Sequence, residues 1–156
     1  MKAVLQRVSG ASVRVDGREV AAISRGLLVL AGAADGDSDD DVDWLAQKIV
    51  NLRIFDRDGK FQRSLIDCGA QVLLVSQFTL LGSTRKGRRP SFGGAAAPEL
   101  ARRLLERLAA RIADLGPEVA TGEFGANMEV ELINDGPVTI LLDSRERLEP
   151  RRAGPR

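Results

Sequence analysis

The segment Val75–Leu80, which reads Val-Ser-Gln-Phe-Thr-Leu, places hydroxyl and amide groups directly after a buried apolar run. Ser76, Gln77 and Thr79 can donate and accept hydrogen bonds. The backbone N–H groups of a chain that leaves a strand can also stabilise an oxyanion, with Phe78 and Thr79 best placed to do so. These residue types indicate either a site that polarises a carbonyl compound or an ordinary strand end whose polar groups satisfy one another.

A second polar segment, Asn134–Thr139, reads Asn-Asp-Gly-Pro-Val-Thr. Only X-Pro peptide bonds are readily cis. A cis Gly136–Pro137 bond would point two neighbouring carbonyl groups in one direction and offer an ammonium group a rigid pair of acceptors without a side chain. The residues alone favour the simpler alternative, a turn that joins two strands in a hairpin.

The residues that the chain lacks exclude several kinds of catalysis. It has no histidine and no tyrosine, and it has one cysteine, Cys68. Ser-His-Asp and Cys-His catalysis are therefore excluded, as are zinc sites built on histidine and cysteine and any internal disulfide framework. No metal or organic cofactor is expected, and a lone thiol fits a reducing compartment.

Two clusters of charge have a plain and a functional interpretation each. Six aspartates lie between Asp35 and Asp43, where they suit the start of a helix better than a calcium loop, because an EF-hand ladder of ligands is missing. Four positive charges fill most of a five-residue stretch: Arg85, Lys86, Arg88 and Arg89. They are either solvated charges or contacts to the phosphates of a nucleic acid.

The elements that must position these groups follow from hydropathy patterns. Alternation and apolar runs predict strands at 3–8, 11–15, 18–23 and 26–32, a short buried strand at 72–75, and two strands at 128–133 and 138–142 on either side of the Gly-Pro turn. Apolar residues at helical spacing predict one helix from Ser38 to Leu52 and another from Pro98 to Leu115. The order of elements, which is strands, helix, strand, helix and strands, predicts an α/β domain with a mixed sheet.

The length and charge of the chain fit a single domain. It has 156 residues, a mass of 16.8 kDa and a formal net charge of +1. We predict one domain over residues 1–143 and a charged, disordered tail over residues 144–156. No apolar stretch approaches the roughly 20 residues of a membrane span, and the N-terminus lacks the apolar core of a secretory signal. A cytoplasmic location is expected.

The chain resembles the D-aminoacyl-tRNA deacylases, a family that proofreads chirality in translation. The resemblance runs from Met1 to about Leu142 and is most specific in the pair Ser-Gln-Phe-Thr-Leu and Asn-Asp-Gly-Pro-Val-Thr, in this order. Further matching segments are Gln6-Arg7-Val8, Ala11-Ser12-Val13, the apolar run from Gly26 to Leu30, Arg53-Ile54-Phe55, Arg89-Pro90-Ser91-Phe92 and the segment Thr121–Met128.

The resemblance implies a fold in which mixed, largely antiparallel sheets form a barrel-like layer covered by two helices. It also implies a homodimer whose active sites lie at the subunit interface, each combining the segment Ser76–Thr79 of one chain with the Gly136–Pro137 step of the other. That step would be cis and would exclude the side chain of an L-amino acid. Arg7 matches the arginine that holds the step, and Asn134 and Met128 are assigned to substrate binding.

The implied activity is hydrolysis of the ester bond of D-aminoacyl-tRNA, and of glycine mischarged on tRNA. With tRNA as the implied substrate, we favour contact with tRNA phosphates for Arg85, Lys86, Arg88 and Arg89. No DNA or membrane partner is implied. Two roles for Thr79 stay open, a positioning group or a covalent nucleophile, and we favour the first. Two other functions also stay open: removal of a small L-amino acid by a relative with a trans Gly-Pro step, and tRNA binding without turnover.

Overall fold

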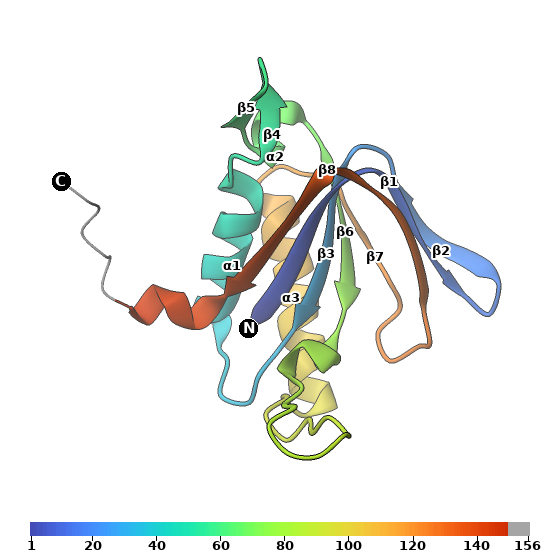
Figure 1. The fold of residues 1–156 in the computed structure, drawn as a ribbon, viewed down its shortest axis with the longest axis vertical. Helices are drawn as coiled ribbons and strands as arrows, with labels where there is room; N and C mark the ends of the chain where they lie inside the picture. Colours follow the sequence, from blue (N-terminus) through green and yellow to red (C-terminus); the bar gives the residue numbers. More distant parts are fainter. Residues whose placement is uncertain (150–156) are drawn as a thin grey trace.

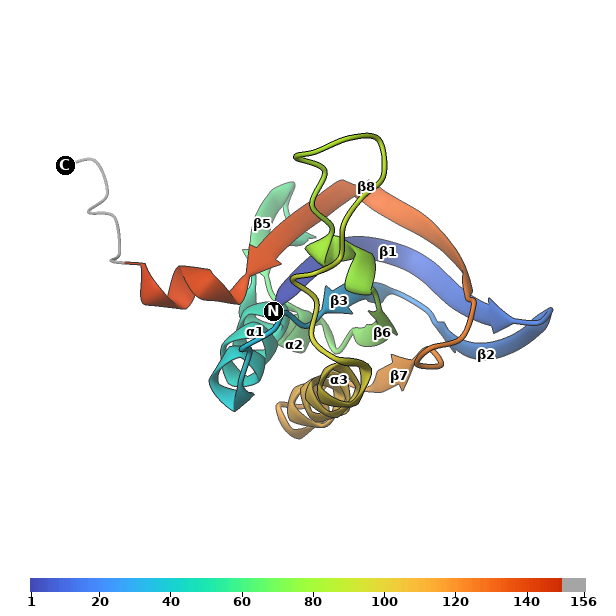
Figure 2. The ribbon, with the colours of Figure 1, turned by 90° about the horizontal axis from the view of Figure 1, so that it is seen from below.

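The computed structural model of the chain describes residues 1–149. Its central element is a mixed six-stranded sheet. The strands in spatial order are β2 (Arg18–Ile23), β1 (Lys2–Val15), β3 (Gly26–Gly32), β6 (Gln71–Ser76) and β7 (Val119–Thr121), and β8 (Glu129–Asp143) pairs with β1. The pairs β3–β6 and β6–β7 are parallel, and the remaining pairs of this sheet are antiparallel. The sheet curls so that β8 and β2 arch over its inner face (Figure 1, Figure 2). The predicted mixed, barrel-like α/β fold is thereby confirmed.

Two helices cover the outer face of the sheet, as predicted. They are α1 (Asp39–Asn51) and α3 (Pro98–Asp114), and Figure 2 shows them side by side on one face of the sheet. Asp41 accepts a hydrogen bond from the backbone N–H of Ser38, which caps α1. Pro98 begins α3 because its missing N–H costs nothing in the first turn. Within the described chain, neither helix nor any other is long and apolar enough to cross a membrane.

The core has two parts, one on each face of the sheet. The larger part lies between the sheet and the two helices and includes Leu27, Leu45, Ile49, Leu104 and Leu108. The smaller part lies inside the curl of the sheet. Its buried residues are Val8, Ala11, Val13, Ile23, Leu28, Leu73 and Val75. Because the apolar run of β3 is covered on both faces, it carries almost no polar residue.

Two strand predictions at the N- and C-terminal ends are wrong. The predicted strands 3–8 and 11–15 form one continuous strand, β1. The two C-terminal strands also form one strand, β8, so Asn134–Pro137 does not make a hairpin turn. Both halves of β8 pair with β1 in the same antiparallel sense, with Leu132 opposite Ala11 and Ile140 opposite Leu5.

A large bulge stands where the hairpin turn was predicted. Asn134 pairs with Val8 and Thr139 pairs with Gln6, so the four residues 135–138 of β8 face only Arg7 of β1. We call residues 135–138 the Gly-Pro bulge. The alternation of apolar residues is the same before and after it, which is why the sequence pattern alone suggested two strands.

Smaller elements extend this frame. A hairpin of β4 (Phe55–Arg57) and β5 (Lys60–Arg63) and the short α2 (Leu65–Cys68) connect α1 to β6. The 3₁₀ turn η1 (Phe78–Leu81) follows β6. These elements were not predicted, because each is too short to show a period.

The prediction of a disordered tail is wrong for its first residues. Ser144–Leu148 form a 3₁₀ turn, η2, and Ser144 is fully buried. The backbone N–H of Ser144 donates to the carbonyl of Met1, and Arg147 pairs with Asp41 at 3.2 Å. These contacts attach η2 to α1 and to the N-terminus. Residues 150–156 of the predicted tail lie outside the described residues.

Candidate active site

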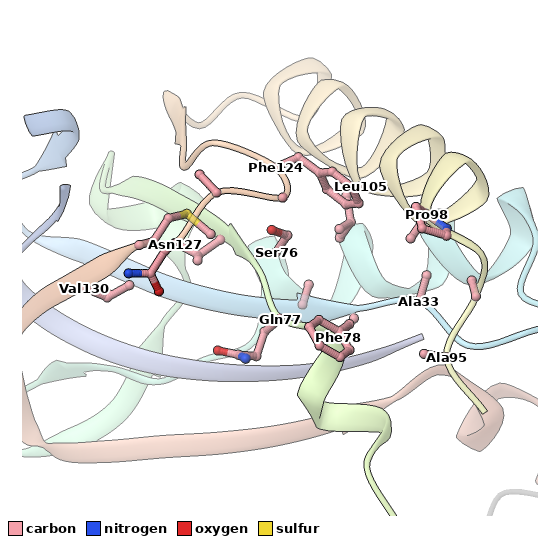
Figure 3. A pocket seen from close by; sticks show the side chains of 18 residues that line it. Ala33, Ser76, Gln77, Phe78, Ala95, Pro98, Leu105, Phe124, Asn127 and Val130 are labelled. Atoms are coloured by element: carbon pink, nitrogen blue, oxygen red, sulfur yellow. The ribbon is translucent and has the colours of Figure 1, made fainter. Parts of the chain in front are cut away.

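A cavity of about 550 Å³ opens at the carboxyl end of β6 (Figure 3). Its floor is formed by the ends of β3 and β6, and its walls come from the chain before α3 and from the segment between β7 and β8. Ser76, Gln77 and Phe78 line it, as does Met128. The structure therefore brings four of the predicted site residues to one cavity.

Main-chain contacts set the position of this strand end. The backbone N–H of Gln77 donates to the carbonyl of Ala31 at 2.8 Å. Gly32 lies so close that a Cβ atom on it would stand 2.6 Å from the carbonyl oxygen of Gln77. The edge of β3 therefore fixes Gln77 through backbone atoms alone, and a side chain at position 32 would push it away.

The turn η1 directs the next residues differently. The Phe78 ring is 58% exposed and meets Phe92 edge-to-face, with ring centroids 5.0 Å apart. The side-chain amide of Gln77 donates to the hydroxyl of Thr79. Thr79 itself is exposed and does not line the cavity formed by the described residues. The first N–H groups of a helical turn lack partners within it, so the N–H groups of Phe78 and Thr79 are suited to an oxygen ligand.

The wall opposite β6 comes from the segment Gly122–Met128. Phe124 and Asn127 line the cavity there beside Met128 (Figure 3). Gly122 donates its N–H to the carbonyl of Leu74 at 3.0 Å, which joins this segment to β6. Sequence reasoning assigned no role to Phe124 or Asn127, although both lie in a segment that carried the resemblance.

The Gly-Pro bulge is held by Arg7, whose side chain reaches it from β1. Arg7 is only 5% exposed. Its Nε donates to the carbonyl of Asp135 at 3.0 Å, and its Nη1 donates to the carbonyl of Ile54 at 2.9 Å. The guanidinium also pairs with Asp56 at 3.1 Å and with Asp135 at 3.3 Å. Arg7 therefore connects the bulge to the β4–β5 hairpin.

Asn134 closes the bulge from its other end. Its side-chain amide donates to the carbonyl of Arg7 at 2.9 Å and to that of Val138 at 3.0 Å. The Gly136–Pro137 peptide bond is cis, and both residues are exposed. Asn134 and Arg7 thus shape the bulge and leave Gly136 and Pro137 facing outward.

The cavity and the Gly-Pro bulge lie apart within one chain. Among the described residues, those of the bulge do not line the cavity. In Figure 1 the bend of β8 lies at the upper end of the molecule beside β4, and the green turn η1 lies at the lower end. The structure therefore separates two groups of residues that the resemblance assigns to a single site.

The basic residues Arg85, Lys86, Arg88 and Arg89 are all exposed on the loop between η1 and α3. Two hydrogen bonds between the backbones of Ser83 and Ser91, at 2.8 and 2.9 Å, close the base of this loop. Figure 2 shows the loop standing out from the body of the molecule. It follows η1, whose first residue, Phe78, lines the cavity.

A titratable group with a large pKa shift lies away from both regions. Burial raises the pKa of Asp41, but hydrogen bonds from the Ser38 backbone, from Ser144 and from Arg147 outweigh it and lower the pKa from 3.8 to about 2. Asp41 lies in the first turn of α1 and contacts η2 through Arg147. Its role is structural.

Comparisons with known proteins agree on one family. A family model described as D-Tyr-tRNA(Tyr) deacylase matches residues 4–143. The D-aminoacyl-tRNA deacylase of Roseiflexus castenholzii is 57% identical over 152 residues, which are 97% of each chain. That of Chloroflexus aurantiacus is 56% identical over 157 residues, covering 100% of this chain and 98% of the relative.

Solved structures show the same fold. One described as c-Myc DNA Unwinding Element Binding Protein is 40% identical, with a TM-score of 0.87 over 92% of this chain and 98% of the other. Another, described as a probable eukaryotic D-amino acid tRNA deacylase, has a TM-score of 0.78 at 18% identity over 90% and 97% of the two chains. The second similarity supports the fold alone.

Proposed function

The chain belongs to the D-Tyr-tRNA(Tyr) deacylase family, and on this premise we propose that it hydrolyses the ester bond of D-aminoacyl-tRNA. The products are the free D-amino acid and tRNA. Glycine mischarged on tRNA is a second proposed substrate. The observation that carries the proposal is the cavity at the end of β6, where backbone and amide groups converge in a chain without histidine. We also propose a cytoplasmic location, because tRNA is used there.

An aminoacyl ester is already activated, so a strong base is not needed. A water molecule attacks the ester carbonyl, and the N–H groups of Phe78 and Thr79 stabilise the oxyanion that forms. The bond between the carbonyl carbon and the ribose 3′-oxygen then breaks. The neighbouring 2′-hydroxyl of the terminal adenosine passes its proton to that leaving oxygen and takes up the proton released by the attacking water, whose remaining hydroxyl becomes part of the free acid. Gln77 orients Thr79, which acts as a positioning group.

We assign chiral selection to the Gly-Pro bulge of a second copy of the chain. The separation of bulge and cavity within one chain supports this assignment, because Gly136 and Pro137 face outward. In a homodimer the bulge of one copy would cover the cavity of the other, with Met128 on the cavity wall. The main-chain atoms of the Gly-Pro bulge would bind the substrate ammonium group and leave no room for the side chain of an L-residue, whereas a D-residue or glycine fits.

The exposed basic loop gives the tRNA a second contact. Arg85, Lys86, Arg88 and Arg89 lie on the loop that follows η1, and η1 itself follows the strand end that lines the cavity. They can therefore neutralise phosphates of the acceptor stem. Charge reversal at Lys86 and Arg88 should weaken tRNA binding and flatten its salt dependence without changing the chirality preference. Unchanged affinity at low salt would contradict this contact.

The activity is tested with purified protein and D-Tyr-tRNA, L-Tyr-tRNA and Gly-tRNA. We expect kcat/KM for the D-ester to exceed that for the L-ester by about 100-fold or more, because steric rejection by a rigid backbone costs several kcal/mol. Equal rates for both enantiomers would refute chiral selection. Binding of tRNA without release of amino acid would instead indicate a module without turnover.

The shared site is tested by mixing two variants. Gly32→Ala disturbs the cavity but leaves the bulge intact, and Arg7→Met does the reverse. After unfolding and refolding together, heterodimers contain one site built from the intact cavity and the intact bulge. D-selective activity should then return to about one quarter of the wild-type level, since half of the dimers carry one intact site of two. If each cavity works with the bulge of its own chain, only the summed activity of the two variants will be seen.

A further inference from the structure

A second cavity lies behind the wall of the first. It has a volume of about 400 Å³ and lies between α3 and the segment Thr121–Phe124. Ser76, Leu105 and Phe124, which Figure 3 labels on the wall of the first cavity, line both cavities, so one layer of side chains separates them. Nothing in the proposed ester hydrolysis uses it.

The cation of Arg102 lines this second cavity. The guanidinium carbon of Arg102 lies 4.6 Å from the centroid of the Phe124 ring, in cation–π contact. Within residues 1–149, Arg102 makes no ion pair, whereas Arg103 and Arg107 on the same helix pair with Asp39 at 3.5 and 3.2 Å. The contact with Phe124 orients the guanidinium and leaves its N–H groups available to a ligand.

Glu106 adds a matching acceptor. It lies one helical turn after Arg102, so both side chains leave the same face of α3, and both line the second cavity. Glu106 also lacks a hydrogen-bonding or ion-pair partner in the described part of the chain. Glu123, at the same cavity, pairs with Arg18 at 3.7 Å. The second cavity thus offers donors and an acceptor side by side, with apolar walls at Leu74, Leu105 and Ala109.

We propose that this cavity binds the cytosine base that precedes the terminal adenosine of tRNA, a subsite that rests on the proposed function. The Watson–Crick edge of cytosine has two acceptors, O2 and N3, and one donor, the N4 amino group. Arg102 can donate to the acceptors, and the Glu106 carboxylate can accept from the amino group. The negative charges of Glu106 and Glu123 balance the positive charge of Arg102, so the cavity suits a neutral base better than a phosphate.

The position of the cavity supports the same ligand. If the ester lies at Ser76–Phe78, the penultimate nucleotide is separated from it by the terminal adenosine and must lie further along the surface. The second cavity begins at Ser76 and continues along α3 to Ala109. Uracil has a carbonyl oxygen where cytosine has its amino group, and this oxygen would face the Glu106 carboxylate. The subsite would therefore discriminate between the two pyrimidines.

The experiment compares D-tyrosyl minihelices that differ only in the penultimate nucleotide, cytidine or uridine. For the wild-type protein we expect kcat/KM to be about 10-fold lower with uridine, and Arg102→Ala should lose about 10-fold on the cytidine substrate. Glu106→Gln should reduce the preference for cytidine, because an amide can also donate to the uracil oxygen. Arg103→Ala, which removes the same charge from a residue that faces α1, should keep the preference.

Binding of the dinucleotides CpA and UpA, measured by calorimetry on the wild-type protein, gives a readout that needs neither turnover nor a variant. Tighter binding of CpA supports the subsite, and equal affinities overturn it. If wild-type protein hydrolyses both minihelices at the same rate, this inference fails and the proposed function stands. If it hydrolyses neither, the proposed function fails, and the dinucleotide affinities still decide the subsite.

Discussion

The cavity at the end of β6 and the Gly-Pro bulge of β8 are held in place in opposite ways. The cavity floor is positioned by main-chain contacts between neighbouring parallel strands, such as the hydrogen bond from Gln77 to Ala31. The bulge is positioned by side chains, those of Asn134 and Arg7, and Arg7 lies 128 residues away from Asp135 in sequence. A substitution that adds atoms between the backbones of β3 and β6 should therefore disturb the cavity. Loss of the Arg7 guanidinium alone should disturb the bulge.

The largest effect is expected from Arg7→Met, which keeps the length of the side chain and removes its donors. The carbonyls of Ile54 and Asp135 lose their partners, so the free energy of unfolding should fall by about 3 kcal/mol. The ratio of D- to L-ester hydrolysis should fall as well, because the bulge is no longer held. Urea unfolding and kcat/KM for both enantiomers measure the two effects.

Arg14→Met is the matched control, since Arg14 is an exposed arginine of the same strand. It should leave both quantities close to wild type. Arg7→Lys should recover part of the selectivity. A destabilised Arg7→Met protein with an unchanged D-to-L ratio would show that Arg7 supports the fold but not chiral selection.

Gly32→Ala tests the cavity in the same way. The added Cβ would lie 2.6 Å from the Gln77 carbonyl oxygen, and this backbone cannot yield as a flexible side chain would. We expect kcat/KM for the D-ester to fall about 100-fold through displacement of the strand end, with the remaining activity still D-selective. Gly94→Ala is the control, because a Cβ there meets open space. Loss of D-selectivity in Gly32→Ala would contradict the assignment of hydrolysis to the cavity and of chiral selection to the Gly-Pro bulge.

Acid should destabilise the protein through Asp41, which lies outside both the cavity and the Gly-Pro bulge. The pKa of Asp41 is about 2 in the folded protein against 3.8 ordinarily. Because the folded pKa is the lower one, Asp41 contributes about 2 kcal/mol of stability above pH 4, which is lost as the pH falls from about 4 to 2. Asp41→Asn should be less stable at pH 7 and less sensitive to acid over this window.

Thermal melting from pH 7 to pH 2 checks this effect, with the exposed Asp40→Asn as control. The D-to-L ratio of Asp41→Asn should match the wild type, because Asp41 neither lines the cavity nor belongs to the Gly-Pro bulge. An unchanged acid transition in Asp41→Asn would show that another carboxylate controls acid unfolding.

The smallest effect is expected at Thr79. Its hydroxyl accepts from the Gln77 amide and does not line the cavity, so Thr79→Ala should reduce kcat no more than about threefold, as the loss of one exposed hydrogen bond does. Single-turnover hydrolysis of D-Tyr-tRNA measures it. A near-total loss of turnover with unchanged tRNA affinity would favour a covalent role for the hydroxyl.

The amino-acid sequence was sufficient for features that depend on neighbours along the chain. The helices at 39–51 and 98–114 follow from their apolar spacing and from Ser38 and Pro98. The buried strand that ends at Ser76 follows from its apolar run, and the family follows from two specific segments in the right order. Each of these signals is local, because side-chain period and backbone restriction act within a few residues.

Features that depend on pairing partners were decided only in three dimensions. The alternation on both sides of Gly136–Pro137 fits a hairpin as well as a single bulged strand, and only pairing with β1 decides between them. The same holds for η2, whose charged residues suggested disorder until Met1 and Asp41 were found beside it. It also holds for Phe124, which packs against Arg102 between two cavities. Hydrogen bonding and ring contact depend on distance in space, and a sequence pattern records only distance along the chain.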